Sequence, residues 1–213
     1  MSSSSDIIEE ALTQSQVVSK ETVTDASTCK WIGLTKIKYK DPNNVIREWE
    51  MAVRKSTASI GIDGVAIIAI VIHPDRAPRL LLVKQFRPPL EGLCIELPAG
   101  LIDEGETAEE AAMRELKEET GYRGTVKSVG KTIYADPGFT NTNLVTVTVE
   151  IDETLPENQH PKQHLEESEF IECLFAPLNG LAAELSSLEK GGCKIDARLS
   201  SIAEGFELAR SYF

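Results

Sequence analysis

The stretch GLIDEGETAEEAAMRELKEETGY, residues 100–122, decides the fold of this chain of 213 residues. Its second half contains Glu115, Glu118 and Glu119, whose spacing of three and four residues places them on one face of a helix. Like charges at that spacing repel each other, so a helix that served packing alone would gain from a lysine there. Hard divalent cations such as Mg²⁺ prefer oxygen ligands. The carboxylates of this stretch therefore suit a hard divalent cation.

The helix is predicted over residues 107–120. Thr107 is a typical N-cap, Glu110 completes a capping box with it, and Gly121 is a typical helix stop. An alternative interpretation of the acids is a solvated helix face on which Arg114 pairs with neighbouring carboxylates. The spacing of the residues around the helix favours the metal site over this alternative.

Nine positions at fixed spacing in this stretch resemble the Nudix box at every defined position. They are Gly100, Glu106, Arg114, Glu115, Leu116, Glu118, Glu119, Gly121 and Tyr122. The resemblance implies a Nudix hydrolase of the α/β class, with a mixed β-sheet in an α/β/α sandwich and an N-terminal β module. Such enzymes hydrolyse nucleoside diphosphates linked to another group. The resemblance also assigns a structural role within the motif to Gly100, Glu106, Arg114 and Gly121.

Further matches resemble the ADP-ribose pyrophosphatase branch of that family. They are ELPAGLIDEGE before the helix, VKQFRPP at 83–89 and DPGFTN at 136–141, with Pro137 sixteen residues after Gly121. The branch implies hydrolysis of ADP-ribose, and of other ADP-sugars, to AMP and ribose 5-phosphate. Two alternatives stay open: a Nudix hydrolase of another nucleotide sugar or of a dinucleotide, and a non-catalytic Nudix-fold nucleotide sensor.

The same resemblance assigns roles to individual residues. Two or three Mg²⁺ ions, with Mn²⁺ as the alternative, would be held by the Ala99 carbonyl and by Glu115, Glu118 and Glu119. Substrate contacts are expected from Trp31, Trp49, Glu50, Arg54, Arg87, Leu101 and Asp136. The tryptophans would sandwich adenine with Glu50 nearby, the arginines would contact the diphosphate, and Leu101 and Asp136 would hold the terminal ribose. Relatives are dimers with crossed N-terminal β modules, so a homodimer is implied in which the partner supplies some adenine contacts.

A general base is also expected beside the catalytic Glu115 and Glu119. In relatives it comes from a loop before a late strand, and here that loop reads HLEESEFIE, residues 164–172. Alignment of EFIE with the family pattern selects Glu169, and Glu166 and Glu167 compete for the role.

The net charge of −12, from 22 Lys+Arg and 34 Asp+Glu, narrows the classes of partner. It argues against general nucleic-acid binding through a basic surface and against docking on anionic lipid. The charge is uneven, because residues 91–120 hold ten acids and two bases, whereas residues 28–55 hold seven bases and three acids. Four scattered cysteines and the acidic, serine-rich start predict an intracellular protein with reduced thiols. The cytoplasm is the expected compartment, and the nucleus and the mitochondrion stay open.

Three regions are expected along the chain: a mobile tail over 1–27, an N-terminal β module over 28–57 for dimerisation and adenine contacts, and the hydrolase domain over 58–213. The module reads as a hairpin around the turn DPNN at 41–44. Apart from the helix at 107–120, the sequence predicts a loop at 98–106 and the following elements. Strands are expected at 64–72, 79–86, 93–97, 126–134, 143–151 and 169–175, and helices at 179–190 and 196–211.

Overall fold

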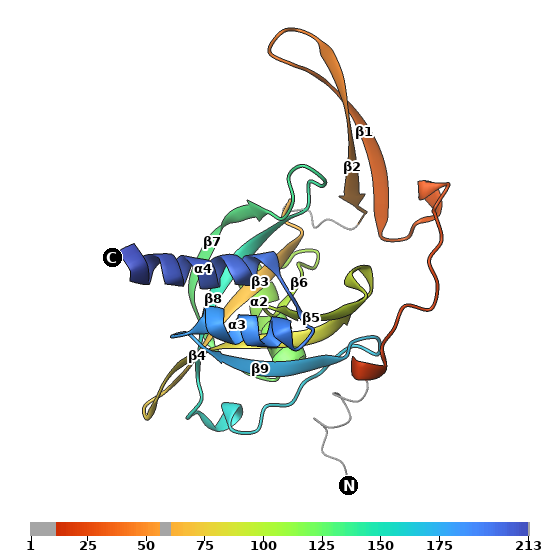
Figure 1. Cartoon of the computed structure of the whole chain (residues 1–213). Coiled ribbons are helices and arrows are strands. Elements are labelled where there is room, and N and C mark those ends of the chain that lie inside the picture. Colours follow the sequence, from red (N-terminus) through yellow and green to blue (C-terminus); the bar gives the residue numbers. More distant parts are fainter. Residues whose placement is uncertain (1–11, 56–60, 213) are drawn as a thin grey trace.

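The computed structural model describes residues 12–55 and 61–212 (Figure 1). Of the tail predicted over 1–27, residues 1–11 lie outside the described part of the chain. Leu12 is buried, most of residues 13–25 are exposed, and a 3₁₀ helix, η1, covers Ala26–Thr28.

An eight-stranded mixed sheet forms the centre of the molecule. Its strands are β3 (Gly64–His73), β4 (Arg76–Arg87), β5 (Gly92–Glu96), β6 (Ala99–Leu101), β7 (Thr125–Tyr134), β8 (Asn143–Asp152), β9 (Ile171–Pro177) and β10 (Lys194–Ile195). The order is β10-β5-β4-β3-β8-β7, with β6 paired to β3 and β9 paired to β4. β3 runs parallel to β8 and antiparallel to β4, which confirms the predicted mixed sheet.

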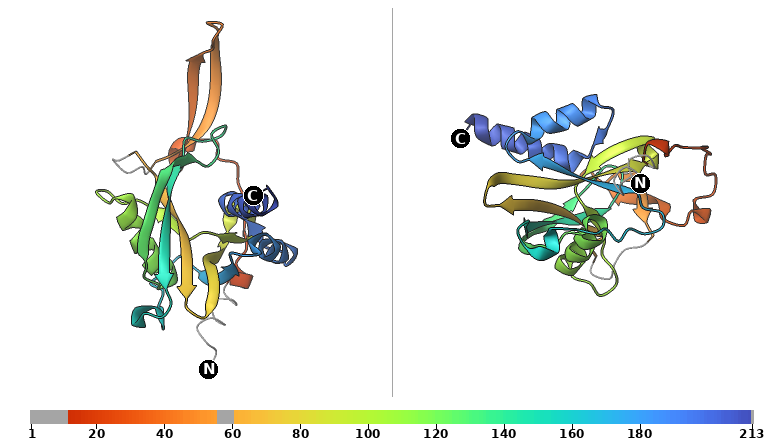
Figure 2. Two further views of the ribbon diagram at one scale, coloured as in Figure 1. Left: turned by 90° about the vertical axis from the view of Figure 1, so that its left-hand side faces the viewer. Right: turned by 90° about the horizontal axis from the view of Figure 1, so that it is seen from below.

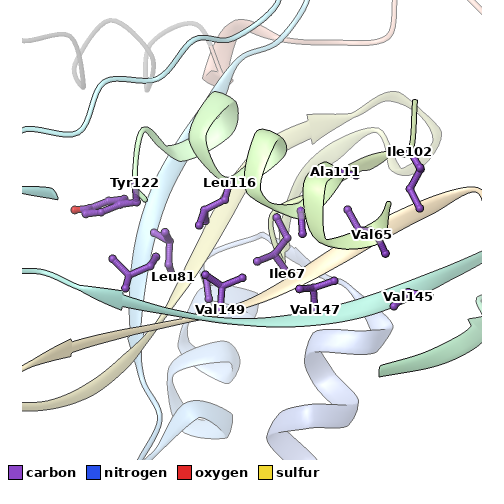
Figure 3. Close-up of a cluster of buried hydrophobic side chains, with 14 of the residues drawn as sticks. Val65, Ile67, Leu81, Ile102, Ala111, Leu116, Tyr122, Val145, Val147 and Val149 are labelled. Atoms are coloured by element: carbon purple, nitrogen blue, oxygen red, sulfur yellow. The ribbon is translucent and has the colours of Figure 1, made fainter. Parts of the chain in front are cut away.

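Helices cover both faces of this sheet. They are α2 (Ala108–Thr120) on one face, and α3 (Leu181–Lys190) and α4 (Ala197–Tyr212) on the other (Figures 1 and 2). Successive residues of a strand point to opposite faces, so β3 contributes to two apolar clusters. Val65 and Ile67 pack with Leu116 of α2 in one cluster (Figure 3), and Ala66 packs with Leu199 of α4 in the other. The predicted α/β/α sandwich is confirmed.

The N-terminal β module is a hairpin that projects from the body of the molecule (Figures 1 and 2). β1 (Ile32–Lys40) pairs antiparallel with β2 (Ile46–Arg54) over their whole length. The carboxylate of Asp41 accepts hydrogen bonds from the backbone N–H groups of Asn43 and Val45 and so holds the predicted turn. Residues 56 and 57 of the predicted module lie outside the described residues.

Three details differ from the expectations. β6 lies where a loop is predicted and pairs with β3, Gly64 opposite Leu101. Gly64 permits this close pairing, because a Cβ there would lie 2.6 Å from the carbonyl oxygen of Gly100. The two-residue strand β10 is too short to leave a periodic signal in the sequence. β9 begins at Ile171, so Glu169 lies in the turn before the strand and not in it.

Two further observations concern the described part of the chain. Among the described helices, none combines the length and the apolar character needed to cross a bilayer. Cys29, Cys94, Cys173 and Cys193 are all free thiols. The remaining short elements are the 3₁₀ helices η2 (Pro88–Leu90) and η3 (Pro156–Asn158).

Candidate active site

Helix α2 is fixed at both ends by the residues that the sequence predicts. The hydroxyl of Thr107 accepts a hydrogen bond from the backbone N–H of Glu110 at 3.2 Å, and the Glu110 carboxylate accepts one from the backbone N–H of Thr107 at 2.8 Å. Gly121 ends the helix in the left-handed region, at φ 76°. Leu116 is fully buried against the sheet. The rotation of α2, and with it the direction of its acidic face, is therefore set by packing.

The three glutamates of this face differ in burial. The side chain of Glu115 is 13% exposed and that of Glu118 43% exposed, and Glu119 is buried. Each helical residue turns the chain by about 100°, so Glu119 lies roughly 40° from Glu115, whereas Glu118 lies about 60° to its other side. Glu115 and Glu119 consequently face the sheet, and Glu118 lies toward the surface.

Glu119 is buried with few hydrogen-bond partners, and this burial raises its proton affinity. Its Oε2 accepts a hydrogen bond from the backbone N–H of Ala99 at 3.0 Å. Burial raises the pKa of Glu119 to about 8, and the carboxylates of Glu115 and Glu169 act in the same direction. Burial also raises the pKa of Glu115, against the opposing effect of Arg114. The protein alone thus disfavours the ionised form of both carboxylates.

The guanidinium of Arg114 forms hydrogen bonds to several groups of the box. It donates to the carboxylate of Glu106 at 2.8 and 2.9 Å and to the carbonyl of Leu101 at 2.9 Å. Its guanidinium, through these hydrogen bonds, lowers the pKa of Glu106. The same group donates to Glu115 at 2.7 Å and to Glu118 at 3.2 Å. Arg114 therefore ties the loop before α2 to the helix, which is the structural role expected of it and of Glu106.

The predicted metal ligands are adjacent but are not arranged as a preformed cage. In the described part of the chain, no group of three His, Cys, Asp or Glu side chains is placed to hold a metal ion. The reason is that Arg114 holds Glu115 and Glu118, while Glu119 is held by Ala99.

Gly100 leaves room for the acidic face. A Cβ built at this position would collide with the carboxylate of Glu115. Any side chain at residue 100 would therefore displace Glu115 from its place between α2 and β6. This close approach explains physically why the first position of the box is a glycine.

Glu169 lies in a tight turn beside these carboxylates. Its backbone N–H donates to the carbonyl of Glu166, and its Oε2 accepts from the backbone N–H of Glu166, each at 3.0 Å. Its carboxylate acts in the same direction as burial in raising the pKa of both Glu115 and Glu119. Glu169 stays the predicted base, and Glu166 and Glu167 of the same turn stay its competitors.

A cationic cavity of about 300 Å³ adjoins the acidic face. Its lining includes Arg54, Arg87 and Arg198 together with Ala99 and Leu101. The backbone at residues 99–100 is shared, since it lines the cavity on one side and contacts the carboxylates of α2 on the other. Positive and negative surfaces thus meet at one strand.

The three arginines of the cavity differ in their partners. Arg87 donates two hydrogen bonds to Glu96, at 2.6 and 2.7 Å, and Arg198 is held in the same way by Asp196. Over residues 12–55 and 61–212, no acidic side chain pairs with Arg54. Arg54 therefore presents an uncompensated positive charge, while Arg87 and Arg198 are locked in orientation.

In a single chain, the two tryptophans that are predicted to bind adenine lie far apart. Trp31 is 63% exposed and Trp49 49% exposed. Trp49 lies opposite Ile37 in the hairpin, six positions along from Trp31, which corresponds to about 20 Å. One chain therefore cannot place both indoles against the same adenine.

Trp49 contacts the segment after β7 rather than the cavity. Its indole N–H donates to the carbonyl of Gly138 at 3.0 Å, and together with Pro137 and Phe139 it lines an apolar groove. Asp136 begins the same turn and is absent from the cavity lining. Glu50 lies on the other side of β2 and pairs with Lys36 at 3.4 Å. The structure thus does not bring Trp49, Glu50 or Asp136 of one chain to the cavity that Arg54, Arg87 and Leu101 line.

Comparison with known proteins agrees with this arrangement. The model of the NUDIX domain matches residues 63–192, which hold strands β3 to β9, α2 and the turn with Glu169. The chain belongs to the NUDIX family. It is 52% identical to an ADP-ribose pyrophosphatase of Saccharomyces cerevisiae over 92% of this chain and 86% of that protein. It is 37% identical to an ADP-sugar pyrophosphatase of Mus musculus, over 81% and 78% of the two chains.

The NUDIX fold is also seen in solved structures. The crystal structure of an ADP compounds hydrolase superposes with a TM-score of 0.54 over 78% of this chain and 80% of that chain, at 22% identity. That likeness concerns the fold. The predicted family and its ADP-ribose pyrophosphatase branch are confirmed by the match to the domain and by the identity to the relatives.

Sequence reasoning about this NUDIX protein missed several residues of the cavity. The sequence assigns no role to Arg198, although this residue lines the cavity from the start of α4. Asp63 and Asn143 also line it and exchange two hydrogen bonds, at 3.0 and 3.2 Å, across the starts of β3 and β8. Only the pairing of these strands could have revealed Asp63 and Asn143, because eighty residues separate them in sequence.

Proposed function

We propose that this protein hydrolyses the diphosphate of ADP-ribose, and of other ADP-sugars, to AMP and ribose 5-phosphate, with the help of a divalent cation. The observation that carries the proposal is the junction at residues 99–100, where a cationic cavity meets the acidic face of α2. A diphosphate needs positive charge, and a divalent cation needs carboxylates. The substrates of the named relatives support an ADP-sugar as the compound bound there.

The carboxylates of α2 fit a divalent cation by their chemistry. Glu115, Glu118 and Glu119, with the carbonyl of Ala99, would hold two or three Mg²⁺ ions, or Mn²⁺ in their place. Burial raises the pKa of Glu119 to about 8, so positive charge supplied beside it would favour its ionised form. When bound, the cation supplies that charge, neutralises the diphosphate and acidifies water.

The arginines of the cavity bind and orient the diphosphate. Arg87 is held by Glu96 and so presents its guanidinium in one orientation, which suits a planar contact with phosphate oxygens. Arg54 has no acidic partner among the described residues and is available to the substrate anion. Both stabilise the negative charge that develops on the phosphate oxygens during attack by water.

Glu169 acts as the general base. A water molecule attacks one phosphorus in line, Glu169 accepts the proton that the water loses, and the bond from this phosphorus to the bridging oxygen breaks. The hydrogen bond from the backbone N–H of Glu166 fixes one carboxylate oxygen of Glu169 and leaves the other for the water. The two products are AMP and ribose 5-phosphate.

The adenine site forms between two chains. Since Trp31 and Trp49 are separated by about 20 Å along one hairpin, a sandwich needs Trp31 of one chain and Trp49 of a partner. Glu50 and Asp136 lie outside the cavity of their own chain and would then contribute to that of the partner.

The surface of the hairpin supports such a homodimer. Its exposed apolar residues form a larger group than isolated surface side chains usually do: Trp31, Ile32, Leu34, Ile37, Tyr39, Val45, Ile46 and Trp49. A second hairpin crossing over it would remove this apolar area from water. Analytical ultracentrifugation is expected to show a dimer, and a monomer at micromolar concentration would contradict this part of the proposal.

One experiment tests the activity. The purified protein is incubated with Mg²⁺ and ADP-ribose, ADP-glucose, ADP-mannose, a non-adenine nucleotide sugar, NADH or a diadenosine polyphosphate, and the products are separated by chromatography. We expect AMP and ribose 5-phosphate from ADP-ribose. A preference for another nucleotide sugar or a dinucleotide would overturn the substrate and keep the hydrolase.

A nucleotide sensor without catalysis is the competing function. It would bind the same compounds and turn over none of them. The intact sequence RELKEE of the box, residues 114–119, favours the enzyme, because loss of these carboxylates is the simplest route to a non-catalytic relative. We place the activity in the cytoplasm, where the four free thiols would stay reduced.

A further inference from the structure

The segment at residues 162–164 closes the C-terminal end of α2. The backbone N–H of His164 donates to the carbonyl of Glu118 at 2.8 Å, and the side-chain amide of Gln163 donates to the carbonyl of Glu119 at 2.6 Å. The backbone of Lys162 lies so close to Gly121 that a Cβ there would collide with it. The last carbonyls of a helix lack partners within the helix. This segment supplies them for two of the acidic residues.

Gln163 also bonds to the start of β9. Its Nε2 donates to the carbonyl of Ile171 at 2.9 Å, so the two hydrogens of one amide reach α2 and β9. The Sγ atom of Cys173 lies 3.7 Å from the same nitrogen. Gln163 is partly buried among these groups. A side chain from a loop without regular structure therefore holds two structural elements together.

Helix α2 carries the proposed metal ligands, and the start of β9 adjoins the proposed general base. Glu119 belongs to the acidic face, and Glu169 lies two residues before Ile171. The start of β9 lies against the end of α2, since the Sγ atom of Cys173 is 3.8 Å from the carbonyl oxygen of Glu119. The separation between the base and the acidic face thus depends on how the start of β9 is held against the end of α2.

We propose that Gln163 is a positioning residue that fixes Glu169 relative to Glu115 and Glu119. This inference rests on the proposed function, in which Glu169 accepts the proton of the attacking water. Gln163 touches neither the cavity nor the substrate groups, and it acts through the backbone on either side of Glu169.

The first test replaces Gln163 by methionine, which has a similar length and no hydrogen-bond donor. Because small misplacements of catalytic groups are costly, we expect Gln163→Met to lower kcat about tenfold and to change KM for ADP-ribose by less than about twofold. The control is Gln159→Met in the same loop, where the amide donates only to the carbonyl of Thr154, at 3.3 Å. An unchanged kcat in a folded Gln163→Met protein would overturn the proposal.

A double-mutant cycle distinguishes positioning of Glu169 by Gln163 from a general loss of stability. If Gln163 acts through Glu169, the substitution Gln163→Met will have almost no further effect on kcat in a Glu169→Gln background. Full additivity of the two effects would show that Gln163 serves stability alone. If Gln163→Met does not fold, Gln163→Asn replaces it, since its amide is one methylene shorter and does not reach both carbonyls.

Hydrogen exchange gives a readout that needs neither metal nor substrate. In the metal-free protein, Gln163→Met is expected to accelerate exchange of the amides at 164–171, and Gln159→Met is not. Equal protection in wild type and Gln163→Met would contradict the inference even if the enzyme is active. Absence of turnover in the wild type would instead sink the proposed function, while the exchange result still reports on whether Gln163 holds the turn.

Discussion

The backbone N–H of Ala99 donates a hydrogen bond to Oε2 of Glu119 over 3.0 Å and thereby joins β6 to α2. This bond lies at the boundary between the cationic cavity and the acidic face. It gives Glu119 a fixed position and still leaves its carboxylate short of positive charge. The first two predictions concern this residue.

Replacement of Glu119 by glutamine should remove turnover and keep the fold. The amide oxygen of glutamine can still accept the hydrogen bond from Ala99, but it brings no negative charge to a cation. Since metal assistance is worth several kcal/mol, we expect kcat to fall by about 100-fold or more. The control is Glu109→Gln, an exposed acid in the first turn of the same helix. A fully active Glu119→Gln protein would remove the argument for the acidic face.

Glu119 should also make the metal-free protein less stable at alkaline pH. Its pKa is raised from 4.5 to about 8, so the folded state resists an ionisation that the unfolded state accepts. The free energy of unfolding should therefore fall as pH rises from about 4.5 to 8, by a few kcal/mol at most, since one pKa unit corresponds to about 1.4 kcal/mol. Below pH 4.5 both states are protonated and the effect vanishes.

Urea denaturation in EDTA at pH 5.5 and pH 8 measures this effect. Other groups titrate as well, so the wild type is compared with Glu119→Gln at both values. The wild type should lose more stability between the two pH values than the variant, and Mg²⁺ should restore it. The same pH dependence in both proteins would show that Glu119 ionises normally.

Gly100→Ala should reduce activity with little loss of stability. The added Cβ collides with the carboxylate of Glu115, which is the end of a flexible side chain and can swing aside. We expect a fall in kcat of about tenfold or more, because a displaced ligand weakens the metal site. Gly205→Ala in α4 is a matched control, since its Cβ meets open space and alanine favours a helix by about 0.5–1 kcal/mol. Wild-type kinetics in Gly100→Ala would refute the role of this close approach.

The two tryptophans offer a test of the shared site. Trp31→Ala and Trp49→Ala should each raise the KM for ADP-ribose strongly while changing stability little. If each sandwich takes Trp31 from one chain and Trp49 from the other, mixed dimers of the two variants contain one intact site. If the chains pair at random, about half of the dimers are mixed, so about one quarter of all sites are intact. These sites appear as a kinetic phase with the wild-type KM for ADP-ribose. Co-expressed, differently tagged chains give this mixture, and no recovery would place both indoles in the same chain.

The sequence predicted the box better than its surroundings for a physical reason. Capping, helix spacing and glycine stops are local, so Thr107, Gly121 and the acidic face could be inferred from neighbouring residues. The family and the hydrolase class followed from the box, the branch followed from further segments such as DPGFTN at 136–141, and all three are confirmed. The paired partners Asp63 and Asn143 depend on strands that meet only in the folded chain.

The expected sandwich of adenine marks the limit of inference from one sequence. The resemblance assigns Trp31 and Trp49 to one base, and only the register of the hairpin shows that they lie far apart in a single chain. For the general base, three glutamates compete in sequence. The structure adds the turn in which the backbone N–H of Glu166 donates to the carboxylate of Glu169, and the role of Glu169 stays a prediction.

The direction of α2 has a consequence for how the protein would respond to its cation. Glu115, Glu118 and Glu119 all lie in the second half of the helix, toward the negative end of its macrodipole. An isolated helix would be more stable with cationic residues there. The amide groups at 163–164 offset part of this field, and the remainder favours capture of a positive ion. Electrostatic repulsion in the metal-free protein would thus contribute to the affinity proposed for the cation, so substitutions that relieve this repulsion should weaken cation binding.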